Sequence, residues 1–336
     1  MTNPVFGIDL GTYAVKIYQA AADQIYVQKN MIAIENGRNI IACGDEAYEM
    51  YEKAPAAIQV SSPVNYGVIA DIRNMEALLR TLVSRLQRGS LRSGDFFVTV
   101  PSDITEVEKR AFSDLIKDAR IKAKKVYAVD KAIADGLGMG IDVKNSQGVL
   151  VVDVGYDTTE ISILSLGGIV ISRLLKVGGH SFDNAIVSAV RREHNLVIGM
   201  KTAERIRMFF NDLEHRGETC SIYGRDVVTG LPVERTMRSD FVANTLEEGF
   251  RTIVDSIRLI LERTPPELSA DIYRHGLFLT GGASQEEGLA AAIHNDLNLG
   301  VNLSENPLTC AAIGLSMVMN RANYRSLAYT IEGLGK

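Results

Sequence analysis

The sequence has few cysteines and histidines, and they are not spaced as a redox or metal site. Cys43, Cys220 and Cys310 lie far apart, form no Cys-x-x-Cys pair and are odd in number. A reducing cytoplasm is therefore the simplest compartment for the chain. His180 has no companion His or Cys at ligand spacing, which argues against a metal role for it.

Long apolar runs and an excess of positive charge are also missing. The N-terminus, Met1-Thr2-Asn3-Pro4, lacks the basic and apolar regions of a signal peptide, and no apolar run is long enough to cross a bilayer. The net charge of -5 argues against nucleic acid as the main partner, because nucleic-acid-binding surfaces are normally basic. The composition, 46% hydrophobic and 23% charged, is that of a globular protein, and 336 residues fit two lobes.

The most informative stretch is residues 148–164. A continuous apolar run ends at Asp153, a turn with Gly155, Thr158 and Thr159 follows, and a second β-branched run resumes. This pattern predicts two buried strands joined by a tight turn. A carboxylate at the tip of a buried strand, next to a turn with converging N–H groups, can meet a metal-bound phosphate. An ordinary hairpin would show the same pattern, so this stretch alone leaves both interpretations open.

A second and a third stretch favour the phosphate interpretation. Residues 5–18 repeat the plan, with Asp9, Gly11 and Thr12 between two apolar runs. Residues 275–284 form a predicted buried strand that ends in a Gly-Gly turn. Glycines at such turns let the backbone approach a ligand closely. The three stretches together predict two related halves that share one nucleotide in the cleft between them.

The order Asp-x-Gly-Thr, Asp-x-Gly…Thr-Thr and Thr-Gly-Gly resembles the actin, heat-shock chaperone and sugar kinase superfamily. Within it, the chain is similar to the bacterial actin family MreB from about Gly7 to about Gly314. The longer motifs that carry this resemblance include Val100-Pro101-Ser102, Gly224-Arg225-Asp226-Val227-Val228-Thr229-Gly230-Leu231-Pro232 and Asn306-Pro307-Leu308-Thr309-Cys310.

The resemblance implies an α/β, actin-like two-lobed fold. Each lobe would have a ribonuclease-H-like sheet-and-helix core and a smaller inserted subdomain. The expected bounds are 1–31 and 65–147 for the core of lobe I, with the C-terminal helix of about 306–336; 32–64 for its small subdomain; 148–182 and 245–305 for the core of lobe II; and 183–244 for its small subdomain.

The resemblance also implies ATP or ADP with Mg²⁺ in the cleft. Asp9 and Asp153 would hold Mg²⁺ through water, and both, with Thr158, would serve catalysis. Glu204 and Arg207 lie one turn apart on a helix that lines the adenosine side in the family. The implied nucleotide-binding residues are Gly11, Thr12, Tyr13, Lys16, Gly155, Tyr156, Asp157, Thr158, Thr159, Glu204, Arg207, Gly281, Gly282 and Ala283.

The chain departs from the family pattern at three positions. Lys131 stands where the family has the acid that orients the attacking water, and an ammonium cannot accept a proton from water. Tyr156 and Asp157 replace two glycines of the second phosphate turn, and the Asp157 charge would repel a polyanion nearby. We therefore expect at most a weak ATPase.

The sequence leaves the roles of two basic features open. Lys16 follows the first phosphate turn, where its ammonium could neutralise phosphates as a lysine does in actin, or could be solvated on an outward strand position. The predicted helix 74–86 and the loop after it carry a basic face and Leu91. This face could contact anionic lipid weakly or could be an ordinary solvated face. The arginines concerned are Arg80, Arg85, Arg88 and Arg92.

The function that these features and the resemblance imply is that of a filament-forming cytoskeletal protein. It would be cytoplasmic and peripheral to the inner face of the cell membrane. It would polymerise with adenine nucleotide and organise cell-wall synthesis and cell shape with membrane proteins of cell-wall elongation. A first alternative is a non-polymerising membrane-assembly adaptor like the FtsA and PilM branch, which also tends to carry Lys at the Lys16 position. A second is a sugar or acid kinase, for which the sequence shows no catalytic-base motif.

Overall fold

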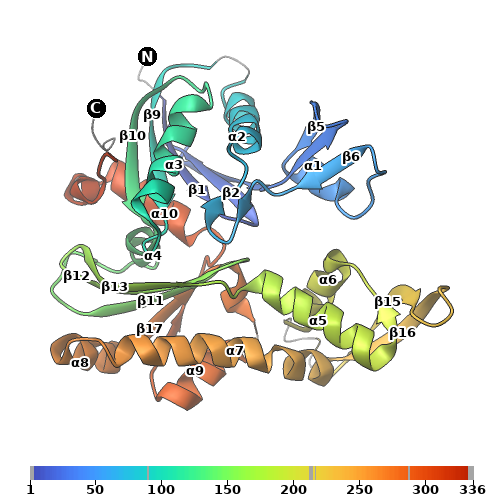
Figure 1. Cartoon of the computed structure of the whole chain (residues 1–336). Helices are drawn as coiled ribbons and strands as arrows, with labels where there is room; N and C mark the ends of the chain where they lie inside the picture. The colour runs from blue at the N-terminus through green and yellow to red at the C-terminus, as the bar shows by residue number, and fades with distance from the viewer. Residues whose placement is uncertain (1–3, 89–90, 212–214, 216, 287, 332–336) are drawn as a thin grey trace.

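The computed structural model describes residues 4–88, 91–211, 215, 217–286 and 288–331, which form two sheets of five strands with helices around them (Figure 1). The first sheet has the order β10-β9-β1-β2-β3, and the second has the order β13-β12-β11-β17-β18. The strands of the first sheet are β1 (Val5–Leu10), β2 (Ala14–Gln19), β3 (Gln24–Lys29), β9 (Gly94–Val100) and β10 (Ala123–Asp130). Those of the second are β11 (Val149–Val154), β12 (Thr159–Ser165), β13 (Gly168–Leu175), β17 (Leu277–Thr280) and β18 (Val301–Leu303).

The two sheets have the same topology around their first strands. β1 pairs antiparallel with β2 and parallel with β9, and β11 pairs antiparallel with β12 and parallel with β17. Both central strands are almost entirely buried, as their apolar runs predict. The two related halves predicted from the repeated Asp-x-Gly turn are therefore present, and each turn joins the first two strands of its sheet.

The helices cover the sheets and connect them. α3 begins at a capping box formed by Thr105 and Glu108. α7, α8 and α9 lie on the side of the second sheet that faces away from the first (Figure 1). The main helices are α2 (Ile72–Leu86), α3 (Glu106–Asp118), α4 (Lys131–Gly138), α5 (Gly179–His194), α6 (Met200–Asn211), α7 (Ser239–Leu261), α8 (Pro266–His275), α9 (Leu289–Leu297) and α10 (Cys310–Asn320), with the short turns η2 (Gly282–Gln285) and η3 (Ala322–Leu327).

Two small sheets lie at one end of the molecule, one above the other, where the sequence predicts the small subdomains (Figure 1). The first has the order β5-β4-β6 and the second has the order β14-β15-β16. The exact domain boundaries stay a prediction. The elements are β4 (Ile32–Glu35), β5 (Asn39–Cys43), α1 (Asp45–Met50), β6 (Ile58–Ser61), β7 (Val64–Asn65) and β8 (Val68–Ile69) on one side, and β14 (Leu196–Val197), β15 (Thr219–Asp226) and β16 (Pro232–Arg238) on the other.

The apolar core has three parts, and the third joins the two sheets. It combines Phe97 of β9 and Val151 of β11 with residues of α4 and α10. α10 also packs on the first sheet, because Met319 and Leu315 come up against Gly7 of β1. α10 therefore lies against the first sheet, while the assignment of the C-terminal helix to lobe I stays a prediction and residues 332–336 lie outside the described part of the chain.

The crossing of α4 and α10 depends on glycine in both helices. A Cβ added at Gly138 would come within 2.2 Å of the Cys310 carbonyl oxygen, and one added at Gly314 would come within 1.7 Å of the Ala134 carbonyl oxygen. Each glycine therefore lets the backbone of the other helix approach where a side chain would not fit.

Among the described helices, none is both long and apolar enough to span a membrane.

We expect Gly314→Ala to destabilise the protein, although Ala is the better helix former by about 1 kcal/mol. The added methyl group must push α4 away, which should lower the free energy of unfolding by roughly 3 kcal/mol. Urea unfolding measures the change. Gly168→Ala is the control, because its Cβ would meet only the Ser165 carbonyl oxygen at 3.8 Å. Equal stability of the two variants would contradict the close crossing.

Candidate functional site

A cavity of about 670 Å³ lies between the two sheets and is lined by residues of both. Its volume is in the range of small-molecule and cofactor sites. Most of the site residues predicted from the sequence line it, and they arrive from all three glycine-containing turns, α4 and α6. These are Asp9, Gly11, Thr12, Tyr13, Lys16, Lys131, Asp153, Gly155, Tyr156, Thr158, Glu204, Arg207, Gly281, Gly282 and Ala283.

Asp9 lies at the buried end of β1 and is held by two neighbours. Its carboxylate accepts hydrogen bonds from Thr99 Oγ1 at 2.7 Å and from Lys16 Nζ at 3.0 Å. Burial by itself would raise the pKa of Asp9, but the ammoniums of Lys16 and Lys131 and the Thr99 hydroxyl bring it below its ordinary value. Lys16 is 9% exposed and lines the cavity, so the solvated alternative for this lysine is wrong.

Asp153 occupies the equivalent place at the end of β11 and pairs with Lys131, the first residue of α4. Burial alone would lower the pKa of Lys131, but the carboxylates of Asp153 and Asp9 raise it well above its ordinary value. Lys131 is thus a fixed cation. Asp130, the residue before it, accepts a hydrogen bond from the Tyr329 hydroxyl at 2.9 Å and does not line the cavity.

Asp135 and Glu160 are two buried acids of the cavity wall that the sequence reasoning missed. Asp135 of α4 and Glu160 of β12 are 2% and 4% exposed, and one oxygen of each has no hydrogen-bond partner among the described residues. Burial raises the pKa of Asp135 well above its ordinary value and that of Glu160 to about 7. Asp135 had a signal in the sequence, because it interrupts the apolar run of residues 132–137, whereas Glu160 directly follows the polar residues of the turn and had none.

The second phosphate turn differs from its prediction at Asp157. The sequence predicts this carboxylate beside the phosphates, but it does not line the cavity. It instead accepts a hydrogen bond from the Tyr66 N–H at 3.0 Å and lies 2.9 Å from His180 Nδ1. Hydrogen bonding to Asp157 raises the pKa of His180. Thr159 does not line the cavity either, since its hydroxyl donates to the Val177 carbonyl oxygen at 2.9 Å.

The third turn is held against Asp153 by a glycine. Gly281 has a φ of +90°, and a Cβ added there would lie 2.1 Å from Asp153 Oδ1. Both the backbone conformation and the close approach therefore require glycine. β17 and β11 are parallel neighbours, with Thr280 opposite Asp153, which brings the Gly-Gly turn and the second Asp-x-Gly turn together.

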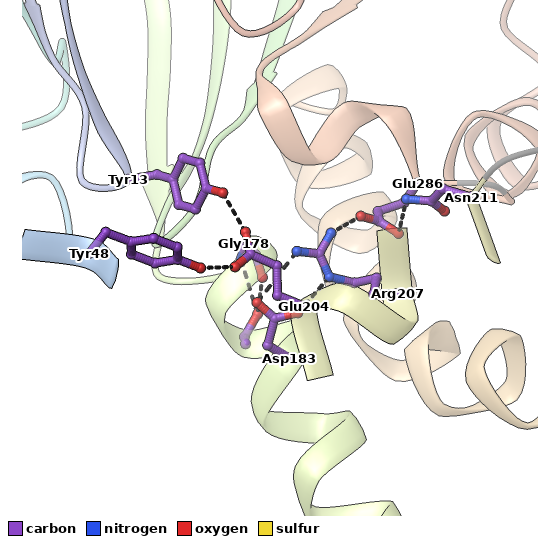
Figure 2. Close-up of polar contacts among 9 residues, drawn as sticks. Tyr13, Tyr48, Gly178, Asp183, Glu204, Arg207, Asn211 and Glu286 are labelled. Atoms are coloured by element: carbon purple, nitrogen blue, oxygen red, sulfur yellow. Dashed lines mark hydrogen bonds and ion pairs between the residues drawn. The ribbon is translucent and has the colours of Figure 1, made fainter. Parts of the chain in front are cut away.

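Glu204 and Arg207 of α6 also line the cavity, and Figure 2 shows their polar contacts. Arg207 forms buried ion pairs with Asp183 of α5, at 2.6 Å, and with Glu286. Burial raises the pKa of Asp183 to about 6, although Arg207 opposes the rise. Glu204, one turn earlier, accepts hydrogen bonds from the hydroxyls of Tyr13 and Tyr48. The ring of Tyr13 also lies 5.1 Å from that of Tyr156.

Comparisons with known proteins agree with this geometry. A family model described as MreB/Mbl protein matches residues 3–326. Cell shape-determining protein Mbl of Bacillus subtilis (strain 168) is 36% identical over 322 residues, which cover 94% of this chain and 95% of Mbl. Cell shape-determining protein MreB of Escherichia coli (strain K12) is 33% identical over 316 residues, covering 91% of this chain and 90% of MreB.

Solved structures give the same result. The crystal structure of MreB5 of Spiroplasma citri bound to AMPPNP superposes with a TM-score of 0.91 at 33% identity, covering 97% of this chain and 98% of MreB5. MreB5 bound to ADP superposes with a TM-score of 0.90. The fold is therefore actin-like, as the order of the three turns predicted. Within that class, the chain belongs to the MreB/Mbl family.

We expect Glu160 to make stability depend on pH. Its pKa is raised from 4.5 to about 7 in the folded protein, so the folded state binds this proton more tightly than the unfolded state. Stability is therefore lost as the pH rises from about 4.5 to about 7, by about 3 kcal/mol at roughly 1.4 kcal/mol per pKa unit. Urea unfolding of the wild type and of Glu160→Gln across this range measures the difference.

The variant should lose less stability over this range than the wild type. Glu234→Gln, on exposed strand β16, is the matched control and should follow the wild-type profile. Parallel profiles for the wild type and Glu160→Gln would contradict the raised pKa of Glu160.

Proposed function

We propose that this protein binds ATP or ADP with Mg²⁺ in the cavity and forms nucleotide-dependent filaments at the inner face of the cell membrane. There the filaments organise cell-wall synthesis and cell shape together with membrane proteins of cell-wall elongation. The observation that carries the proposal is the convergence of the two Asp-x-Gly turns and the Gly-Gly turn on one cavity. The names of the relatives and the nucleotides bound to MreB5 support it.

One part of the cavity carries the positive charge and backbone groups that phosphates of a nucleotide would need. Gly11, Gly155 and Gly282 leave backbone exposed along its wall, and the ammoniums of Lys16 and Lys131 lie beside them. Backbone N–H groups at such turns and lysine point charges are the groups that hold phosphate oxygens. The adenosine part would lie toward α6, where Glu204 and Arg207 line the wall.

The residues present fit Mg²⁺ held through water. The acids of the cavity supply only oxygen ligands, and two of their buried oxygens, on Asp135 and Glu160, have no partner among the described residues. Mg²⁺ prefers oxygen ligands and keeps several waters, and when bound it would neutralise phosphate charge. Asp9 and Asp153 would hold its water ligands, and each already has a lysine on one carboxylate oxygen.

Slow hydrolysis follows from the position of Lys131. Its ammonium is paired with Asp153 and carries no free lone pair, so it cannot orient water by accepting a proton. Losing a general base costs about 10²–10⁴-fold in rate. The chain would therefore act through nucleotide binding more than through turnover.

We expect calorimetry to detect ATP and ADP binding, and steady phosphate release to stay at the level of an Asp153→Asn variant. The reason is that Lys131 replaces the base while the rest of the cavity persists. A thermal unfolding profile checks that the variant is folded. Wild-type phosphate release well above the Asp153→Asn level would contradict this expectation.

Membrane contact would come from the arginines after α2. Arg88 and Arg92 are exposed, whereas Arg85 pairs with Glu46 and Leu91 packs on the core of the first sheet. A lipid contact made by Leu91 is therefore disfavoured, and the weak contact that the sequence left open would come from the arginines. Gly89 and Ser90 lie outside the described residues. Each arginine near an anionic surface is worth about 1 kcal/mol, so contact would become strong only when many subunits act together.

Electron microscopy with ATP, on anionic lipid monolayers and on carbon, tests assembly and membrane contact together. We expect filaments on both supports, and fewer on lipid for Arg88→Glu/Arg92→Glu, because the charges reverse without touching the cavity. Persistent monomers would instead favour the adaptor alternative. The buried ion pair of Lys16 with Asp9 is compatible with it, because the adaptor branch also tends to carry Lys at this position. Equal lipid decoration by the variant would remove the membrane part of the proposal.

A further inference from the structure

The two small subdomains contact each other across the cleft, at the edge of the cavity and beyond it. Tyr48 of α1 and Glu52, which follows α1, belong to one side, and the N-terminal half of α6 belongs to the other. Figure 2 shows Tyr48 bonded to Glu204 of α6. Neither Tyr48 nor Glu52 lines the cavity. Glu52 bonds to Met200 and Lys201, which do not line the cavity either, whereas Tyr48 bonds to Glu204, which does.

Glu204 is the first tie. One carboxylate oxygen accepts the Tyr48 hydroxyl at 2.6 Å and the other accepts the Tyr13 hydroxyl at 2.5 Å, so one side chain of α6 bonds to two elements of the other half. Glu204 is 9% exposed, and hydrogen bonds to a charged, poorly solvated carboxylate are stronger than neutral ones. Burial and Glu204 raise the pKa of both tyrosines, so both hydroxyls stay protonated donors.

Glu52 is the second tie, at the N-terminus of α6. Its carboxylate accepts hydrogen bonds from the N–H groups of Met200 at 2.8 Å and Lys201 at 3.2 Å. These groups have no partner within their own helix, and the positive end of the helix dipole favours the carboxylate. Gly199 makes room for it, since a Cβ there would lie 2.5 Å from Glu52 Oε2. A residue of one half thus caps a helix of the other.

The backbone at Glu52 indicates that this contact is held in place. Glu52 has a φ of +62°, in the left-handed region that a non-glycine residue occupies at a cost of about 1 kcal/mol or more. Lys201 adds a third tie, because its Nζ donates to the Tyr48 carbonyl oxygen and lies 4.2 Å from the centre of the Tyr48 ring. The segment of Tyr48 and Glu52 therefore contacts α6 in three ways: through the Glu204 carboxylate, through the N-terminus of α6 and through the Lys201 ammonium.

We propose that Tyr48, Glu52 and the N-terminal half of α6 form a latch that holds the cleft closed and limits the rate of nucleotide exchange. The effect on nucleotide exchange rests on the proposed function. The contact between the two halves does not depend on it. Entry and release need the two halves to separate at the small sheets, so the latch contacts must break before the ligand leaves. Weakening them should speed exchange. The Glu52 contacts do not involve a cavity-lining residue, whereas loss of the Tyr48 hydroxyl also takes one donor from Glu204.

The test uses the double variant Tyr48→Phe/Glu52→Ala in the full-length protein. It removes one hydroxyl donor and one helix cap, and each such loss is worth a several-fold change in an equilibrium. We expect ADP carrying a fluorescent N-methylanthraniloyl group to dissociate on the order of tenfold faster or more. Glu49→Ala, an exposed glutamate of the same helix, removes the same charge and should dissociate at the wild-type rate.

A second measurement follows closure without nucleotide. Spin labels at Lys53 and Arg205, both exposed, report the distance between the small sheets in a Cys220→Ser background. We expect one short distance in the otherwise unchanged protein and in Glu49→Ala, and a longer or broader distribution in the double variant. A thermal unfolding profile confirms that the double variant is folded.

The outcomes separate the two proposals. Unchanged distances together with a dissociation rate equal to that of Glu49→Ala would overturn the latch. An opened distribution with no binding of the fluorescent ADP to any version would support the latch and overturn the nucleotide function. Faster dissociation with an opened distribution supports both.

Discussion

The close crossing of α4 and α10 is the constraint on which the cavity depends. Glycines at positions 138 and 314 bring the two helix backbones together, and the apolar cluster around them contains residues of both five-stranded sheets. α4 begins at Lys131, whose ammonium enters the cavity. The packing that joins the sheets therefore also positions the cation between them, and a shift of α4 would move Lys131 away from Asp153.

The two halves neutralise their buried aspartates in different ways. In the first half, the residue opposite Asp9 across the strand pair is Lys16, which neutralises it directly. In the second half, the residue opposite Asp153 is Glu160, so the hairpin itself brings two acids together. Lys131 from another element faces both of them. Burial of unpaired charges is costly, which explains why the second half needs a lysine and why Glu160 holds its proton more tightly.

Local patterns in the sequence predicted the buried strands and the three turns, and the resemblance to the MreB family supplied the actin-like fold and the cavity residues of α6. Apolar runs ending in Asp-x-Gly turns set the strands, and the repeat set the two halves. The sequence did not predict where the Asp157 side chain points, because that depends on the Tyr66 N–H and His180, which are distant in sequence. The bonds of Tyr48 and Glu52 to α6 were missed for the same reason, since they join residues about 150 positions apart.

Closure of the cleft is favoured by contacts of the protein itself as well as by those of a ligand, and Glu204 belongs to both sets. A ligand shifts a conformational equilibrium only by its differential affinity for the two states. A nucleotide touching both halves would favour the closed state, and the contacts of Tyr48 and Glu52 favour it already without lining the cavity. The ligand therefore needs to supply less differential free energy to keep the cleft closed. The same contacts raise the barrier to its release, so slow exchange follows from the protein's own contacts as well as from those to the ligand.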